Sequence, residues 1–225
     1  MRKIALLTAL LLACSCGPAV RLAPLGPSDA PDLADQCLSV FPGGMWYAVH
    51  GIEATLPIEN KSAIIGVTVG DRDTRRFRCA GTSVEGVVLF DIIYTPDKIQ
   101  VLRALPPLDD PAFLEGLARD VRFLFFPPQG ELIGAGEKPG EGWACRWRKA
   151  DRSITEVVLV PQGGWIVRLY DKAGKEVRLA RAFSPIKGGF TKEVDLTVRG
   201  VVDYSLRLRL LESGSADLSE DAFTP

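Results

Sequence analysis

Residues 109–128 read DDPAFLEGLARDVRFLFFPP, the clearest helical pattern in a chain of short β-type segments. Asp110 can cap the amino end of a helix, and Pro111 suits its first position. The Pro127–Pro128 pair ends the helix, because proline has no backbone N–H to continue it. The pattern predicts an amphipathic helix over 112–126, and such a helix needs an apolar surface to cover. Its apolar side chains recur at helical spacing: Phe113, Leu114, Leu117, Val121, Leu124 and Phe125.

Strand-like segments flank this helix on both sides, separated by Gly, Asn, Asp and Pro turns. Apolar and polar residues alternate within them, as in the run from Leu206 to Leu210. The pattern predicts a mainly β fold with a helical insertion, in which about ten or eleven antiparallel strands form a sheet under helical cover. A short helix is predicted over 32–40. The predicted strands are 46–55, 62–69, 74–80, 87–95, 98–105, 143–149, 153–160, 165–171, 176–183, 190–199 and 204–211, with a looser Gly-rich stretch over 129–142.

The amino terminus has the pattern of a lipoprotein signal peptide. Met1-Arg2-Lys3 is followed by an uncharged run to Ala13 and then by Cys14. The apolar run of about ten residues is far shorter than the roughly 20 that span a bilayer as a helix. We therefore predict cleavage before Cys14 and lipidation of its thiol. Cleavage before Cys16, a non-lipidated secretion signal and an ordinary buried helix are the alternatives.

This signal divides the chain into four parts: a signal peptide over 1–13, a lipidated amino terminus and flexible tether over 14–31, one domain over 32–211, and a disordered polar tail over 212–225. Ser15 follows the acylated cysteine, and in the sorting rule of bacteria with two membranes a residue other than Asp favours the outer membrane. We expect an outer-membrane lipoprotein that faces the periplasm, with the inner membrane and the cell surface as alternatives.

Charge and cysteine usage exclude two classes of function. The chain has 27 basic and 28 acidic residues, and the balance becomes more acidic once Arg2 and Lys3 are removed, so no basic footprint for nucleic acid is expected. The remaining cysteines form no CxxC pair, which argues against zinc. An oxidising periplasm permits disulfides instead. Cys79 and Cys145 each lie in a strand pattern. A disulfide between them and two buried free thiols are alternatives of equal weight.

The common catalytic patterns are missing from the sequence. His50 is the one histidine, and no G-x-S-x-G, H-E-x-x-H or G-x-G-x-x-G motif occurs. Asp109 and Asp110 are better explained as helix capping than as a catalytic pair, and Asp91 as a side chain on the polar face of a strand. We predict a protein that is not an enzyme and that needs no cofactor or metal. A hydrolase that uses carboxylates alone is the remaining enzymatic alternative.

The chain resembles the lipoprotein-localisation factor superfamily (LolA/LolB-like). The resemblance is carried by the signal ending at Cys14, the segment Val87-Val88-Leu89-Phe90-Asp91-Ile92-Ile93-Tyr94, the helix that runs into Phe125-Phe126-Pro127-Pro128, and the later amphipathic strands. It covers most of 40–211, and LolB-like outer-membrane lipoproteins of uncharacterised function are the nearest match. It implies an unclosed β-barrel, or half-barrel, with an α-helical lid. The exposed hydrophobic loop of the receptor has no clear counterpart, since 81–86 offers only Val84 as a tip.

The resemblance also implies a hydrophobic ligand, such as the acyl chains of lipoproteins or lipids, bound under the helix without covalent chemistry. The helix over 112–126 is then the lid, and each cavity candidate is equally an ordinary core residue. A structural or assembly lipoprotein with a filled core, which binds an envelope protein, is the main alternative. The resemblance leaves the oligomeric state open. The candidate cavity residues are Ile65, Val67, Phe77, Phe90, Ile92, Trp143, Trp147, Leu206 and Leu208.

Overall fold

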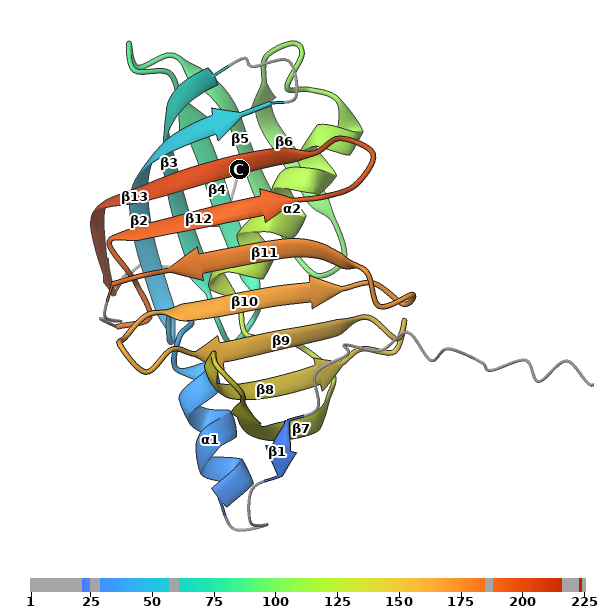
Figure 1. Cartoon of the computed structure of the whole chain (residues 1–225). Helices are drawn as coiled ribbons and strands as arrows, with labels where there is room; N and C mark the ends of the chain where they lie inside the picture. The colour runs from blue at the N-terminus through green and yellow to red at the C-terminus, as the bar shows by residue number, and fades with distance from the viewer. Residues whose placement is uncertain (1–21, 25–28, 57–60, 185–187, 216–222, 224–225) are drawn as a thin grey trace, which may run out of the picture.

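One antiparallel sheet makes up most of the molecule (Figure 1). The computed structural model describes residues 22–24, 29–56, 61–184, 188–215 and 223. Within these ranges 13 strands pair in the order β1-β7-β8-β9-β10-β11-β12-β13-β2-β3-β4-β5-β6, so the sheet ends at β1 and β6 and does not close. The strands are β1 (Ala23–Pro24), β2 (Met45–Thr55), β3 (Lys61–Asp71), β4 (Arg76–Thr82), β5 (Val88–Tyr94), β6 (Ile99–Ala104), β7 (Glu131–Lys138), β8 (Gly142–Arg148), β9 (Ile154–Leu159), β10 (Trp165–Tyr170), β11 (Glu176–Ala182), β12 (Glu193–Val198) and β13 (Tyr204–Ser215).

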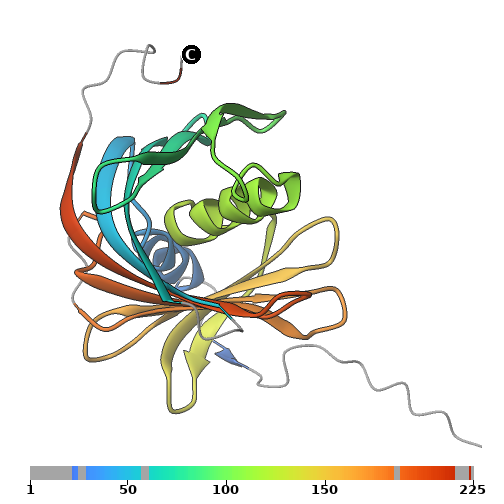
Figure 2. The ribbon, with the colours of Figure 1, turned by 90° about the horizontal axis from the view of Figure 1, so that it is seen from above.

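The sheet curls around helix α2 (Pro111–Phe125), which crosses its concave face (Figure 2). The Asp110 carboxylate accepts a hydrogen bond of 2.7 Å from the backbone N–H of Ala112, so Asp110 is the predicted cap. The helix stops at Phe126, whose extended backbone is the conformation that a following proline favours. The predicted helical insertion and the unclosed antiparallel sheet are confirmed.

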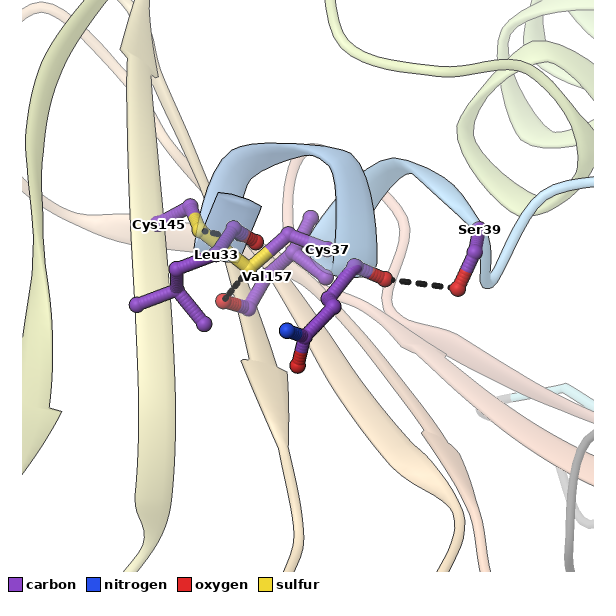
Figure 3. Close-up of a disulfide and its surroundings, with 6 residues drawn as sticks. Leu33, Cys37, Ser39, Cys145 and Val157 are labelled. Carbon is purple, nitrogen blue, oxygen red and sulfur yellow. Dashed lines mark hydrogen bonds between the residues drawn. A yellow bond between two sulfur atoms is a disulfide. The ribbon is translucent and has the colours of Figure 1, made fainter. Parts of the chain in front are cut away.

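Helix α1 (Asp29–Leu38) packs on β7, β8 and β9, at the end of the sheet opposite β6, which confirms the short helix predicted over 32–40. A disulfide joins Cys37 of α1 to Cys145 of β8 (Figure 3). Neither of the two alternatives for Cys79 and Cys145 holds in full, because Cys145 is bonded to Cys37 rather than to Cys79, while Cys79 is a buried free thiol. The physical reason is distance across the sheet: β4 and β8 lie near opposite ends of the strand order, whereas α1 packs directly on β8.

The Gly-rich stretch over 129–142 contains a strand that the sequence did not indicate. Strand β7 pairs with β8 along its length and with β1 at one edge. A side chain at Gly136 would collide with the carbonyl of Ala23, so this glycine permits the close approach of β1. The flexible tether predicted over 14–31 is accordingly wrong in part, because β1 lies inside it and α1 begins within it, at Asp29.

The tail predicted as disordered over 212–225 begins too early. Strand β13 continues past a bulge after Leu210, and residues from Glu212 to Ser215 pair with the first half of β2. The Tyr47 hydroxyl donates a hydrogen bond of 2.9 Å to the Glu212 carboxylate within this extension. The signal peptide and Cys14 lie outside the described residues and remain predictions. In the part of the chain that the structure describes, no helix is long and apolar enough to cross a membrane.

Candidate functional site

The concave face of the sheet is apolar and is packed with side chains under α2. Trp143 shares the inward direction of Cys145 but lies near the end of β8, where 43% of its surface is exposed. Side chains fill the interior under α2, and six of the nine predicted cavity residues belong to this packing. The buried core contains Phe77, Phe90, Ile92, Trp147 and Leu208 of that set, and Leu206 packs against it.

Two predicted cavity residues point the other way. Thr68 of β3 donates to the Sγ of Cys79 inside the core, so Ile65 and Val67 lie on the opposite face of the strand. Val67 is 37% exposed. The inward positions of β3 instead include Gly66 and Gly70, and the Trp46 ring lies where a side chain at Gly70 would be. Hydrophobicity alone selected the wrong face because the inward residues are small to admit that ring.

The apolar side of α2 faces the sheet as predicted. Phe125 is the best anchored, because its ring centroid lies 5.4 Å from that of Trp46. Phe113 is 36% exposed, although its ring contacts that of Phe90 edge-on at 6.0 Å. These contacts make α2 an amphipathic cover whose removal would expose the core to solvent. Leu114, Val121, Leu124 and Phe125 are buried, and Leu117 packs against the core.

A buried polar cluster ties the middle of α2 to the sheet. Asp120 is 5% exposed; one carboxylate oxygen accepts a hydrogen bond of 2.9 Å from Arg178 of β11, and the other accepts a hydrogen bond from the hydroxyl of Tyr204 of β13. Burial raises the pKa of Asp120, and the hydrogen bonds from Tyr204 and Arg178 oppose that rise. Sequence reasoning missed all three residues. The available signal was the position of Asp120 within the apolar stripe, between Leu117 and Leu124.

His50 is a core residue of the same region. It is 4% exposed on β2, and its ring centroid lies 5.4 Å from that of Phe125. Burial lowers the pKa of His50 to about 4, so the ring is neutral at pH 7. A neutral buried imidazole against an aromatic ring is a packing element.

A cavity of about 390 Å³ opens where the carboxyl-terminal half of α2 faces the β8–β9 and β10–β11 turns. Phe41 and Phe126, both members of the buried core, form part of its wall. Cationic side chains dominate its polar lining, and no sequence pattern singled them out. A second hollow, of about 600 Å³, lies over β2, β3, β12 and β13 and is lined mainly by small and charged residues.

The convex face carries a separate buried charge network. Glu156 of β9 is fully buried and pairs with Lys138 at 2.7 Å, with Arg146 at 2.6 Å and with Arg168 at 3.1 Å. Burial opposes its ionisation, yet Lys138 and Arg146 hold the pKa of Glu156 below its usual value. The network faces away from the core, because its neighbour Val157 faces Cys145. Among the described residues no cluster of three or more His, Cys, Asp and Glu side chains could hold a metal ion.

These features define an open antiparallel half-barrel with a helix across its concave face. The sequence matches no protein-family model and no curated protein sequence. A LolA superfamily protein from Nitrosomonas europaea is similar in structure, with a TM-score of 0.58 and 9% identity over 87% of this chain and 97% of that one. A domain from Vibrio parahaemolyticus, described as outer-membrane lipoprotein-sorting, has a TM-score of 0.51 and 11% identity over 88% of this chain and 97% of that one. The chain has the LolA-type fold, as the resemblance predicted.

Proposed function

We propose that this protein is a lipid-anchored lipoprotein of the bacterial envelope that binds a hydrophobic ligand on its concave face, with α2 as a lid. The structural neighbours are described as a LolA superfamily protein and as a lipoprotein-sorting domain, which supports acyl chains as the ligand. No covalent chemistry is required for this function. Acyl-chain burial stabilises a complex by about 0.8 kcal/mol for each methylene.

The observation that supports this function best is the way α2 is held. Its apolar side chains pack on the core, and its buried polar tie to the sheet is the Asp120 cluster with Arg178 and Tyr204. An acyl chain can replace apolar contacts of α2 with contacts of the same kind, since such contacts are non-directional. The helix then moves outward while the β-sheet keeps its pairing.

The envelope location is supported by the disulfide between Cys37 and Cys145, because such bonds persist in oxidising compartments. An acyl group on Cys14 would hold the domain close to its membrane. The eight residues 15–22 span at most about 28 Å when fully extended. That reach fits a receptor or assembly factor that acts at one membrane. Replacement of Cys14 by Ala is expected to release the domain from the membrane fraction.

The test is to purify the unacylated chain, residues 15–225, from envelope extracts and to analyse its organic extract by mass spectrometry. We expect co-purified acyl lipid and saturable binding of a fluorescent fatty-acyl probe. Asp120→Asn should accelerate probe binding several-fold because it weakens the tie of α2, whereas the exposed Glu115→Gln on the same helix should not. A chain that carries no lipid and binds no probe in either variant would rule out this function.

The filled interior favours a second candidate, a structural or assembly lipoprotein that binds an envelope protein. In that case α2 is a permanent part of the core. Deuterium exchange distinguishes the two functions. Amides of α2 would exchange as slowly as those of the central strands in the assembly protein, and faster in the lipid-binding protein, because local opening exposes them.

A further inference from the structure

The cavity of about 390 Å³ beside α2 has a distinctive lining. Its volume lies within the range of small-ligand sites, about 300–1,000 Å³. The wall combines the aromatic side chains of Phe41, Phe123, Phe126 and Tyr170 with charged groups from α2, from β11 and from three strand connections. The five cationic residues in this lining are Arg75, Arg119, Arg122, Lys149 and Arg178.

The acidic residues of the cavity lining offset these cations only in part. Asp151 accepts hydrogen bonds from the backbone N–H and the hydroxyl of Ser153, at 2.9 and 2.6 Å, within its own turn. Asp171 accepts bonds of 2.9 Å from the N–H groups of Ala173 and Lys175 in the next turn. Both carboxylates are therefore engaged in shaping turns, and neither forms an ion pair within the described chain.

Four of the cations form no direct ion pair among the described residues. Arg178 pairs with Asp120, but no ion pair among the described residues involves Arg75, Arg119, Arg122 or Lys149. In this they differ from the buried cations of the convex face, which surround Glu156. Even with Asp120 counted beside Arg178, five cations face three carboxylates, and this surplus of positive charge favours the binding of an anion.

Neighbouring groups hold these cations in place. The Arg75 guanidinium donates a hydrogen bond of 3.1 Å to the carbonyl of Pro127 and lies 5.7 Å from the centre of the Phe126 ring. The Arg122 guanidinium lies 5.1 Å from the centre of the Tyr94 ring. Burial and the charge of Arg122 lower the pKa of Arg75, and the same two causes lower that of Lys149. The cations therefore repel one another, although Asp151 partly offsets this at Lys149, and an anion would relieve that repulsion.

We propose that this cavity, named here the basic cavity, binds the phosphate group of an amphiphile whose acyl chain extends from Phe41 and Phe126 towards the core under α2. Guanidinium groups suit phosphate because their planar donors can engage two oxygens at once. The aromatic wall adjoins the core, so one molecule can place its anion among the cations and its chain against apolar side chains. The acyl-chain part rests on the proposed function, whereas the anion part depends only on the basic cavity. The ligand is thereby narrowed from acyl chains in general to acyl chains that carry a phosphate.

The test measures binding to residues 15–225 with three probes below their micellar concentrations: myristoyl lysophosphatidylglycerol, monomyristoylglycerol and glycerol 3-phosphate. The variant Arg122→Gln/Lys149→Gln removes two charges from different elements. Arg181→Gln is the matched control, because this exposed arginine lies on β11 and faces away from the concave face. We expect lysophosphatidylglycerol to bind at least about tenfold more tightly than monomyristoylglycerol. The double variant should abolish that preference while Arg181→Gln preserves it.

The outcomes separate the basic cavity from the proposed function. Equal binding of the charged and uncharged lipids, unchanged in the double variant, would overturn the basic cavity and leave hydrophobic binding intact. If glycerol 3-phosphate binds as tightly as the lysolipid, the cavity is a site for free phosphate, and the proposal that the phosphate belongs to a lipid is wrong. Binding of glycerol 3-phosphate without either lipid would support the anion site and overturn the proposed function. The melting temperature of the ligand-free double variant separates a binding role from a structural one. If the cations serve binding, this temperature is not below that of the wild type, because the cations that are removed repel their neighbours.

Discussion

The two helices cover the same face of one sheet but are attached to it by different means. Helix α1 is joined to β8 by the Cys37–Cys145 disulfide, and Leu33 one turn earlier is buried beside it. Helix α2, which crosses the concave face (Figure 2), is held by apolar packing and by the Asp120 cluster. The covalent link fixes α1 at one end of the concave face, whereas α2 has only non-covalent contacts with it. Under the proposed function, this difference allows the half-barrel to keep its shape while α2 exchanges its core contacts for a ligand.

The largest expected effect is on α1. Replacement of Cys37 and Cys145 by Ala should lower the free energy of unfolding by about 4 to 5 kcal/mol, because the bond closes a loop of 108 residues. Urea denaturation of the oxidised chain measures this loss. The buried free Cys79→Ala is the matched control and should cost only about 1 kcal/mol. Equal losses in both variants would mean that α1 is held by packing alone.

Acid should destabilise the fold through His50, which packs against Phe125 of α2. Its pKa is about 4 in the folded state against 6.5 in an unfolded chain, so the unfolded chain binds more protons between these values. The contribution of His50 to stability is therefore fully present well above pH 6.5 and is lost as the pH drops towards 4, by about 3 kcal/mol in total and about 2 kcal/mol by pH 5. Urea denaturation from pH 7 to 5 checks the slope. His50→Leu should remove the slope, because the chain has no other histidine; a slope that persists would exclude His50 as its cause.

The Asp120 cluster should contribute less to the free energy of unfolding than the disulfide or His50. Asp120→Asn keeps the shape of the side chain but removes the charge that Arg178 and Tyr204 bind, and we expect a loss of about 2 kcal/mol. Exchange of α2 amides should accelerate, while exchange of α1 amides should not change. Acceleration in both helices would show that they open together and would remove the contrast between them.

The smallest effect is expected at the start of α2. Asp110→Ala removes the cap on the Ala112 N–H and should cost about 1 kcal/mol. Asp109→Ala is the control, since this neighbouring carboxylate is exposed and makes no hydrogen bond to the helix among those described. Thermal melts of the two variants measure the difference. A loss of the same size at Asp109 would point to a general charge effect at the helix amino terminus rather than to capping.

Local patterns of the chain were sufficient to predict the helix ends and most of the strands. Capping residues and prolines act on their immediate neighbours, so the limits of α2 could be predicted from 109–128. Partners that are distant in sequence could not. Cys37 meets Cys145 only because α1 folds back on β8, and Asp120 finds Arg178 only because α2 crosses β11. The inward face of β3 was assigned wrongly because glycines occupy it and the branched residues face outward. The basic cavity escaped notice because its cations come from four separate segments.

The reactivity of Cys79 can be used to measure how often the core under α2 is uncovered. Its thiol lies in the core of the concave face, and burial raises its pKa to about 11. A thiol reagent at pH 8 therefore meets a protonated and shielded sulfur until the molecule opens. In a chain whose Cys14 and Cys16 have been replaced, the rate of Cys79 labelling measures how often the core is uncovered. A ligand that displaces α2 would raise the rate of Cys79 labelling, and a ligand that holds α2 on the sheet would lower it.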